Sequence, residues 1–258
     1  MCATCGCSEE GAVRVHHHEH ASGHDHTHEH AHTPAHAHGD TVRLEEAVLG
    51  RNAGLAEKNR AWFRERGILA LNVVSSPGAG KTTLLVRTIR KLGDRLPISV
   101  IEGDQETSRD ADRVRAAGAP VLQINTGTAC HLDAHMVGHA LETLRPGERS
   151  SVIIENVGNL ICPALFDLGE EKRVLVSSVT EGEDKPIKYP LMFRSADAIL
   201  LNKIDLLPHV EFETSRFLDY VSQVNRRARV FSVSATRGDG MREWYEWVLA
   251  LAGGRSPL

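Results

Sequence analysis

A glycine-rich segment of the chain holds residues that could bind a phosphate group. It reads SSPGAGKTT over residues 75–83, after the apolar run LALNVV and before the helical run TTLLVRTIRKL. At such a turn, backbone N–H groups can surround a phosphate, Lys81 can reach the β- and γ-phosphates, and Thr82 can give an oxygen to Mg²⁺. The pattern departs from G-x-x-x-x-G-K-[ST] only at Ser75, which replaces the first glycine. The predicted phosphate-binding residues are Gly78, Ala79, Gly80, Lys81, Thr82 and Thr83.

A second pair of motifs could select the base. The run NKID follows the apolar run AILL, and the run SAT ends a later apolar segment. A carboxylate after a strand can accept hydrogen bonds from N1–H and the exocyclic amine of guanine, a donor pair that adenine lacks. A backbone N–H of the SAT run could meet O6 of the same base. The order and spacing of the motifs predict GTP, bound through Asn202, Lys203, Asp205, Ser234 and Ala235.

Acidic residues at two strand ends could hold Mg²⁺. Asp104 ends the run VIEGD, and Glu155 and Gly158 have the spacing of an acid-x-x-Gly element, in which the carboxylate holds Mg²⁺ and the glycine amide senses the γ-phosphate. The polar segment after Asp104 could move with the nucleotide state. An acidic helix cap is the alternative, above all for Glu102. The predicted catalytic residues are Lys81, Asp104 and Glu155, and the predicted Mg²⁺ ligands are Thr82, Asp104 and Glu155.

Three cysteines at the start of the chain could enclose a metal ion. Cys2, Cys5 and Cys7 lie close together, and Gly6 permits a tight fold-back. With the α-amine as a fourth ligand, this set suits square-planar Ni(II), although Cu(I) and Zn(II) also bind thiolates. The alternative is a redox-sensitive or incidental cysteine cluster.

A histidine tract follows the cysteines. Eleven of the fifteen histidines lie between residues 16 and 38, where they alternate with Glu, Asp, Thr and Ala, unlike a purification tag. Neutral imidazole binds nickel and zinc. The tract is therefore interpreted as a buffer for several metal ions. The alternative is a solvated linker that binds metals only incidentally.

Another set of metal ligands lies in the apolar part of the chain. Cys130 and His131 are adjacent and are expected to begin a helix, and Cys162 follows the ENVG motif closely. Two thiolates and one imidazole are one ligand short of a tetrahedral site, so water or a partner chain would complete it. The alternative is that the cysteines are small buried apolar residues. His135 and His139, at helical spacing after His131, are interpreted as a solvated helix face.

The chain is expected to consist of three parts, which differ in secondary structure. Residues 1–40 lack apolar periodicity and are expected to be disordered, residues 41–66 are expected to be helical with a break or kink at Gly50 and Gly54, and residues 67–258 form the GTPase domain. Candidates for the buried helix face are Leu44, Val48, Leu55, Trp62 and Phe63. From residue 68, seven strand-like runs alternate with helix-length segments: LALNVVSS, ISVIEG, PVLQIN, SVIIEN, KRVLVSSV, DAILLNK and RVFSVSA. This alternation predicts an α/β fold, a P-loop NTPase with a doubly wound, mostly parallel sheet.

Composition excludes several classes of protein. The chain has 258 residues, a formal net charge of −4 and five cysteines. Residues 1–40 hold six acidic residues against one arginine, and neither this part nor the rest has the basic face of a nucleic-acid binder. No run reaches the roughly 18 apolar residues of a membrane span, and no signal-peptide core is visible. The odd cysteine count favours reduced thiolates and a soluble cytoplasmic protein, with neither nucleic acid nor membrane as a partner.

Together these residues resemble a known family, the hydrogenase nickel-incorporation GTPases called HypB, in the SIMIBI class of P-loop proteins. The segments INTGTACHLDA, ENVGNLICP and EGEDKPIKYP are specific to that family, whereas the P-loop is not, and Ser75 looks ordinary for it. The likeness covers nearly the whole chain and also includes MCATCGC, the histidine tract, NRAWFRERG, SSPGAGKTTLL, VIEGDQETSRDADRV, ADAILLNKIDLLP and SATRGDGM.

The resemblance implies a GTPase with slow hydrolysis that dimerises when GTP is bound and delivers nickel for maturation of [NiFe] hydrogenase. The accessory protein HypA and the hydrogenase large-subunit precursor are the implied partners. Lys185 and Lys188 could touch nucleotide or partner. The implied metal sites, for nickel and in part zinc, are one at Cys2, Cys5 and Cys7, and one across the dimer interface from Cys130, His131 and Cys162.

The order of the motifs also suggests a switch. GTP with Mg²⁺ would order the loops after Asp104 and Glu155, and the second of these loops carries Cys162. Nucleotide state would then reshape the metal site, and linkage requires nickel to change GTP affinity in return.

Two other functions remain open at this point. One is a urease-type nickel chaperone GTPase, although the ENVGNLICPALFDLG segment and the N-terminal cysteines favour hydrogenase. The other is a nickel storage protein with an idle GTPase domain, which would tolerate the loss of Lys81.

Overall fold

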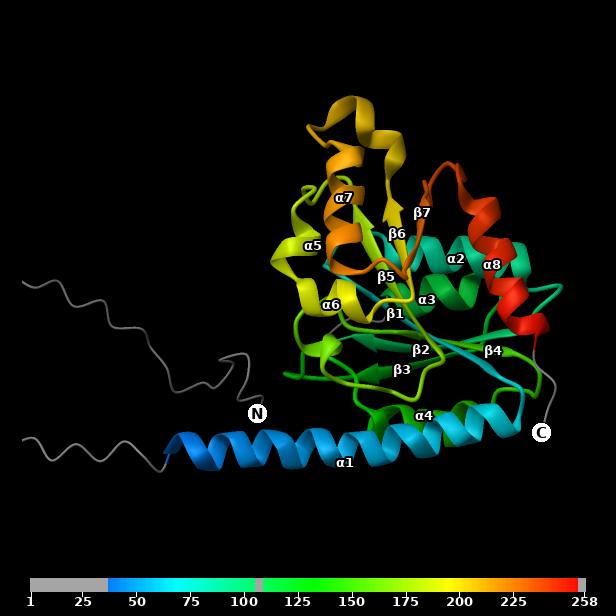
Figure 1. The fold of residues 1–258 in the computed structure, drawn as a ribbon. Coiled ribbons are helices and arrows are strands. Elements are labelled where there is room, and N and C mark those ends of the chain that lie inside the picture. Colours follow the sequence, from blue (N-terminus) through cyan, green and yellow to red (C-terminus); the bar gives the residue numbers. More distant parts are fainter. Residues whose placement is uncertain (1–36, 105–108, 255–258) are drawn as a thin grey trace, which may run out of the picture.

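Seven parallel strands form the centre of the molecule in a computed structural model that describes residues 37–104 and 109–254 (Figure 1). The order across the sheet is β3-β2-β4-β1-β5-β6-β7. Each pair of neighbouring strands in this sheet is parallel, which confirms the predicted doubly wound sheet and all seven predicted strands. The strands are β1 (Leu69–Ser75), β2 (Ile98–Asp104), β3 (Val121–Asn125), β4 (Ser151–Glu155), β5 (Lys172–Ser178), β6 (Ala198–Asn202) and β7 (Arg229–Ser232).

Helices cover both faces of the sheet, because successive residues of each buried strand point to opposite sides. Leu71 and Val73 of β1 pack with α2, α3 and α8, whereas Ala70 packs with α1 and α4 on the other face. Helices α6 and α7 cover that second face over β5 and β6. The helices are α1 (Ala37–Glu65), α2 (Lys81–Leu92), α3 (Arg109–Ala116), α4 (Ala134–Leu144), α5 (Lys185–Lys188), α6 (Pro190–Ser195), α7 (Thr214–Val224) and α8 (Met241–Gly253), with 3₁₀ turns η1 (Cys162–Ala164) and η2 (Ile204–His209).

Helix α1 differs from its prediction. It begins at Ala37 and continues without a break to Glu65, so the expected break or kink at Gly50 and Gly54 is wrong. A Cβ at either glycine would meet nothing within 4 Å, so both positions face open space. An exposed helical glycine costs about 1 kcal/mol relative to alanine without having to interrupt the helix.

The buried face of α1 is also more polar than predicted. Its buried residues include two asparagines as well as Phe63, while Val48 is 48% exposed. Asn59 donates to the carbonyl oxygens of Ala134 (2.8 Å) and Leu168 (3.1 Å). Asn52 accepts from the N–H of Ala134 at 2.9 Å and donates to the carbonyl of Asp167 at 2.8 Å. Side-chain hydrogen bonds therefore dock α1 onto α4 and onto the loop before β5, and Figure 1 shows α1 lying beside α4.

Some predictions on α1 are correct and some fall outside the described side chains. Phe63 is buried as predicted, Leu55 and Trp62 are half-buried, and the side chain of Leu44 is not described. The N-terminal cysteines Cys2, Cys5 and Cys7, and the histidine tract up to residue 36, lie outside the described residues. Within residues 37–104 and 109–254, no helix has both the length and the apolar character needed to cross a bilayer.

Candidate functional site: a phosphate loop beside a thiolate-imidazole cluster

The phosphate loop joins the carboxyl end of β1 to the first turn of α2, the edge at which doubly wound sheets bind ligands. Gly78 and Gly80 adopt φ angles of 75° and 98°, in the left-handed region that favours glycine. A Cβ at Gly80 would also stand 2.6 Å from the side-chain nitrogen of Asn202. The loop therefore requires glycine for its backbone conformation and for a close approach.

Ser75 has a role that the motif comparison did not reveal. Lys81 Nζ donates a hydrogen bond to Ser75 Oγ at 2.9 Å, and Ser75 is fully buried. Burial is the main cause that lowers the pKa of Lys81, and the carboxylates of Glu155, Asp110 and Asp104 oppose it. The Ser75 hydroxyl thus gives the buried ammonium group of Lys81 a hydrogen-bond partner and orients it. Burying such a charge without a partner would cost free energy.

The guanine motifs lie against the phosphate loop. Asn202 donates to the carbonyl of Ala79 at 2.9 Å and accepts from the N–H of Ala235 at 3.0 Å. Lys203, with φ of 61°, donates to the carbonyl of Gly78 at 2.7 Å. Asn202 therefore ties three loops together. Asp205 follows on η2 and is half-buried.

Two buried carboxylates stand beside the phosphate loop. Glu102 of β2 and Glu155 of β4 are partners in the strand register and are 2% and 4% exposed. Glu155 Oε1 accepts from Thr82 Oγ1 at 2.8 Å, while the Oε2 atoms of both glutamates are buried without a hydrogen-bond partner among the described residues. Burial, and then the neighbouring Glu155, raises the pKa of Glu102 to about 8. Burial likewise raises the pKa of Glu155.

This donor set fits Mg²⁺. Hard cations prefer carboxylate and hydroxyl oxygens, and a cation would satisfy buried oxygen atoms that the protein leaves unpaired. Glu102 lies inside β2, so its alternative as a helix cap is wrong, and it was missed as a ligand candidate. The signal was present, because alternation along a strand places Glu102 on the same side of the sheet as Asp104.

The three predicted interior metal ligands are brought together. The ligand atoms of Cys130, His131 and Cys162 all lie within 4.8 Å of one another, and Cys130 Sγ is 3.7 Å from His131 Nδ1. Cys162 is 2% exposed and His131 is 9% exposed. Burial lowers the pKa of His131, which favours the neutral imidazole that binds metals.

The local structure around Cys130 differs from the prediction. Cys130 and His131 do not begin a helix, because α4 starts at Ala134 after Asp133, whose side chain accepts from the N–H of Met136 at 2.8 Å as an N-cap. The His131 ring instead packs on Phe166, with ring centroids 4.0 Å apart. The loop conformation is what lets the histidine turn toward Cys162.

The other predicted side chains near these elements are exposed or, for Lys185, half-buried. His135 and His139 are exposed on α4, which confirms the predicted solvated face. Lys188 of α5 pairs with Asp184 at 2.6 Å, and Lys185 lies over the ring of Tyr189 at 5.1 Å.

One segment, residues 155–162, contacts first the predicted nucleotide pocket at the phosphate loop and then the predicted metal cluster of Cys130, His131 and Cys162. Glu155 contacts Thr82, and a Cβ at Gly158 would stand only 3.1 Å from the Cα of Pro77 in the phosphate loop. Asn159 donates to the carbonyl of Cys130 at 3.4 Å. The segment ends at Cys162 itself.

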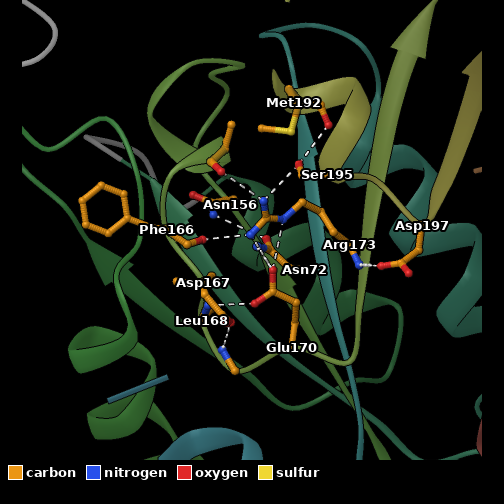
Figure 2. Close-up of polar contacts among 12 residues, drawn as sticks. Asn72, Asn156, Phe166, Asp167, Leu168, Glu170, Arg173, Met192, Ser195 and Asp197 are labelled. Atoms are coloured by element: carbon orange, nitrogen blue, oxygen red, sulfur yellow. Dashed lines mark hydrogen bonds and ion pairs between the residues drawn. The ribbon is translucent and has the colours of Figure 1, made fainter. Parts of the chain in front are cut away.

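A buried polar network around Arg173 supports the loop between Cys162 and β5 (Figure 2). Arg173 donates to Glu170 Oε1 at 2.8 Å and to the carbonyls of Phe166 (2.9 Å) and Ala164 (3.3 Å). Asn72 of β1 donates to the same Glu170 oxygen at 3.1 Å. Arg173 thus holds the loop that presents both Cys162 and the ring packed on His131. Sequence reasoning missed this network, because its members lie far apart in the chain.

Comparison with known proteins places these features in context. The family model described as CobW/HypB/UreG, nucleotide-binding domain, matches residues 69–232. The hydrogenase maturation factor HypB of Rhizobium leguminosarum bv. viciae is 56% identical over 215 residues, which cover 83% of this chain and 72% of that protein. The crystal structure of HypB from Archaeoglobus fulgidus superposes with a TM-score of 0.74 at 40% identity, over 79% of this chain and 99% of that one. HypB from Helicobacter pylori, solved in complex with nickel, also gives 0.74, at 34% identity, over 81% and 99% of the two chains.

Proposed function

We propose that this chain, which belongs to the CobW/HypB/UreG family and within it to the hydrogenase maturation factors HypB, is a GTP-hydrolysing nickel chaperone. It would deliver nickel for maturation of [NiFe] hydrogenase. The observation that carries the proposal is residues 155–162, which run from the carboxylate at the phosphate loop to a thiolate of the metal cluster. A relative solved with nickel supports the identity of the cargo.

GTP is the proposed substrate of the pocket at the carboxyl end of β1. Lys81 and the loop amides bind the phosphates, and Asp205 accepts from the guanine N–H groups. Mg²⁺, which neutralises charge that develops on the phosphates, would be held by Thr82, Asp104 and Glu155, with Glu102 as a further oxygen donor. We propose slow hydrolysis, so that the GTP-bound state lasts long enough for a transfer step.

Nickel is the proposed cargo of the cluster, and zinc fits the same ligands. Cys130, His131 and Cys162 supply three ligands, so a fourth comes from water or from a second copy of the chain in a GTP-dependent homodimer. Residues 1–40 would gather nickel through Cys2, Cys5 and Cys7 and the histidine tract. Thiolate ligands require a reducing compartment, which agrees with a cytoplasmic protein. HypA and the hydrogenase large-subunit precursor are the proposed partners.

The contacts of residues 155–162 give the proposal a physical route. Mg²⁺ and the γ-phosphate would act on Glu155 and on the amide of Gly158, both of which lie against the phosphate loop. The same segment touches the Cys130 loop through Asn159 and ends at Cys162. A shift of the segment with nucleotide state would therefore change the distances among the metal ligands, and nickel must shift the nucleotide equilibrium by the same free energy.

The test measures nickel affinity with GDP and with a non-hydrolysable GTP analogue. We expect the wild-type protein to bind nickel with different affinities in the two states, and we expect Cys162→Ala to lose this difference. His209→Ala, which removes an exposed histidine on η2, serves as the matched control and should behave as wild type. Equal nickel affinities in both nucleotide states of the wild-type protein would refute the proposal.

Complementation separates the remaining alternatives. In a strain that lacks its own maturation GTPase, the wild-type gene should restore hydrogenase activity and Lys81→Ala should not. Restoration by Lys81→Ala would favour a nickel storage protein. Restoration of urease without hydrogenase would favour a urease-type chaperone.

A further inference from the structure

Asn156 lies where the nucleotide pocket and the metal cluster meet. It follows Glu155 directly, and its side chain is 1% exposed. Its backbone N–H donates to the carbonyl of Val73 at 3.0 Å, two residues before β1 ends at Ser75 and the phosphate loop begins. Any displacement of Glu155 is therefore transmitted to Asn156 through one peptide bond.

The side chain of Asn156 reaches the metal-ligand loop. Its Oδ1 accepts from the N–H of Leu132 at 3.0 Å and from the N–H of Val157 at 3.0 Å. Leu132 directly follows His131, so this hydrogen bond holds the backbone of a metal ligand. A Cβ at Gly103 would stand 2.7 Å from Leu132 Cγ, so the end of β2 packs closely on the same residue.

The other end of the carboxamide faces the supporting network. Asn156 Nδ2 approaches Asn72 Oδ1 at 3.4 Å, and Asn72 Nδ2 donates to Glu170 at 3.1 Å. Figure 2 shows these groups leading to Arg173, which holds the backbone of Phe166. The ring of Phe166 packs on His131, so the backbone that follows His131 and the ring against its imidazole are both connected to one buried amide.

We propose that Asn156 is the positioning residue through which nucleotide state sets the nickel affinity of the cluster, an inference that rests on the proposed function. When Glu155 shifts with the γ-phosphate and Mg²⁺, the Asn156 carboxamide moves the N–H of Leu132 with it. This movement reorients His131 relative to the two thiolates. Asn156 touches neither nucleotide nor nickel, and it acts only through the residues on either side.

The experiment isolates the interior cluster within the full-length chain. Replacing Cys2, Cys5 and Cys7 with serine leaves Cys130 and Cys162 as the only thiolates of the five. The thiolate-to-nickel charge-transfer absorption then reports this cluster alone. Nickel affinity is measured by titration against a competing chelator, with GDP and with a non-hydrolysable GTP analogue, in this background and with Asn156→Ala added.

We expect the background protein to show an affinity ratio of roughly fivefold or more between the two states, the usual size of such coupling. Asn156→Ala should bring that ratio to within about twofold of unity while GDP affinity changes little. If Asn156 contributes only to stability, Asn156→Ala should lower the unfolding temperature and leave the affinity ratio unchanged. That result would overturn the inference. No ratio in the background protein would instead overturn the proposed function.

Two further variants keep the test decisive if Asn156→Ala folds poorly. Asn156→Asp keeps the oxygen that accepts from Leu132, so it should retain most of the ratio, and loss of the ratio would contradict the inference. Ser195→Ala removes the hydroxyl that accepts from Arg173 at 3.1 Å, at the far end of the network. It is the matched control, and a ratio lost in this variant would also contradict the inference.

Discussion

The predicted nucleotide pocket and the predicted metal cluster are built in opposite ways. The pocket is organised around one continuous loop between β1 and α2, and it leaves two buried carboxylate oxygens unpaired among the described residues. The cluster takes its ligands from two loops, and α1 and the Arg173 network hold those loops in place. The phosphate loop is therefore formed by residues close together in the chain, beside buried carboxylate oxygens that no described residue pairs with. The cluster instead depends on contacts between residues far apart in the chain. Mutations should separate the two.

Arg173→Ala should have the largest effect, and it should fall on the metal side. It would leave Glu170, paired with Arg173 at 2.8 Å, buried without its counter-charge. Removing one member of a buried pair costs about 3–5 kcal/mol. Chemical denaturation should show this loss, whereas Lys172→Ala, which breaks a more exposed pair with Asp197, should cost far less. Equal losses in the two variants would contradict the assigned role of the network.

Lys81→Ala tests the nucleotide side. We expect GTP hydrolysis to fall by about 10²–10³-fold, the usual loss when a positioned electrostatic donor is removed. Nickel stoichiometry should not change, because Lys81 contacts Ser75 and not the cluster. Phosphate release and nickel titration measure the two outcomes, and Lys58→Ala, at an exposed position of α1, is the control. A parallel loss of nickel binding would show that the two regions are not separable.

His131→Ala is the complementary change on the metal side. Losing one of three ligands should weaken nickel binding at the cluster by about tenfold or more, while GDP affinity stays near the wild-type value. Isothermal titration with each ligand measures both affinities. His135→Ala, an exposed neighbour on α4, should leave both unchanged.

Glu102→Gln should stabilise the nucleotide-free protein while weakening its response to Mg²⁺. The pKa of Glu102 is about 8 in the folded state against 4.5 for the free group, so the unfolded chain releases its proton first as pH rises. The free energy of unfolding should therefore fall from about pH 4.5 to about pH 8 and then level off. The glutamine variant should lose the part of this decline that Glu102 contributes, while Glu155, whose pKa burial also raises, still contributes the rest. Urea unfolding at pH 5 and pH 8 without Mg²⁺ would detect the smaller decline. An unchanged pH dependence would contradict the assignment.

Gly54→Ala should have the smallest effect. The position is helical, exposed and open, so alanine should stabilise α1 by about 0.5–1 kcal/mol. GTP hydrolysis should not change, because α1 docks on α4 and on the loop before β5, away from the phosphate loop. Thermal unfolding and phosphate release measure the two quantities. A destabilised variant would mean that the helix requires glycine at this position.

Prediction from the sequence succeeded where the physical signal is local. Buried parallel strands appear as continuous apolar runs, so all seven were found. The predictions for α1 were less accurate. Glycine propensity and apolar spacing do not show that Asn52 and Asn59 form hydrogen bonds on the buried face of the helix. The expected helix start at Cys130 was wrong because the Asp133 cap begins α4 later.

Residue types and short-range spacing were enough to predict the phosphate loop, the two guanine motifs and the candidate metal ligands, because each short motif can be recognised within its own segment of the chain. The tertiary structure was needed to show that Glu102 lies beside Glu155, that Cys162 lies near Cys130 and His131, and that Asn156 contacts the loop of Leu132. These contacts join side chains from different strands and loops. Their distances are set by how the sheet and helices pack, and no local pattern in the chain encodes that packing.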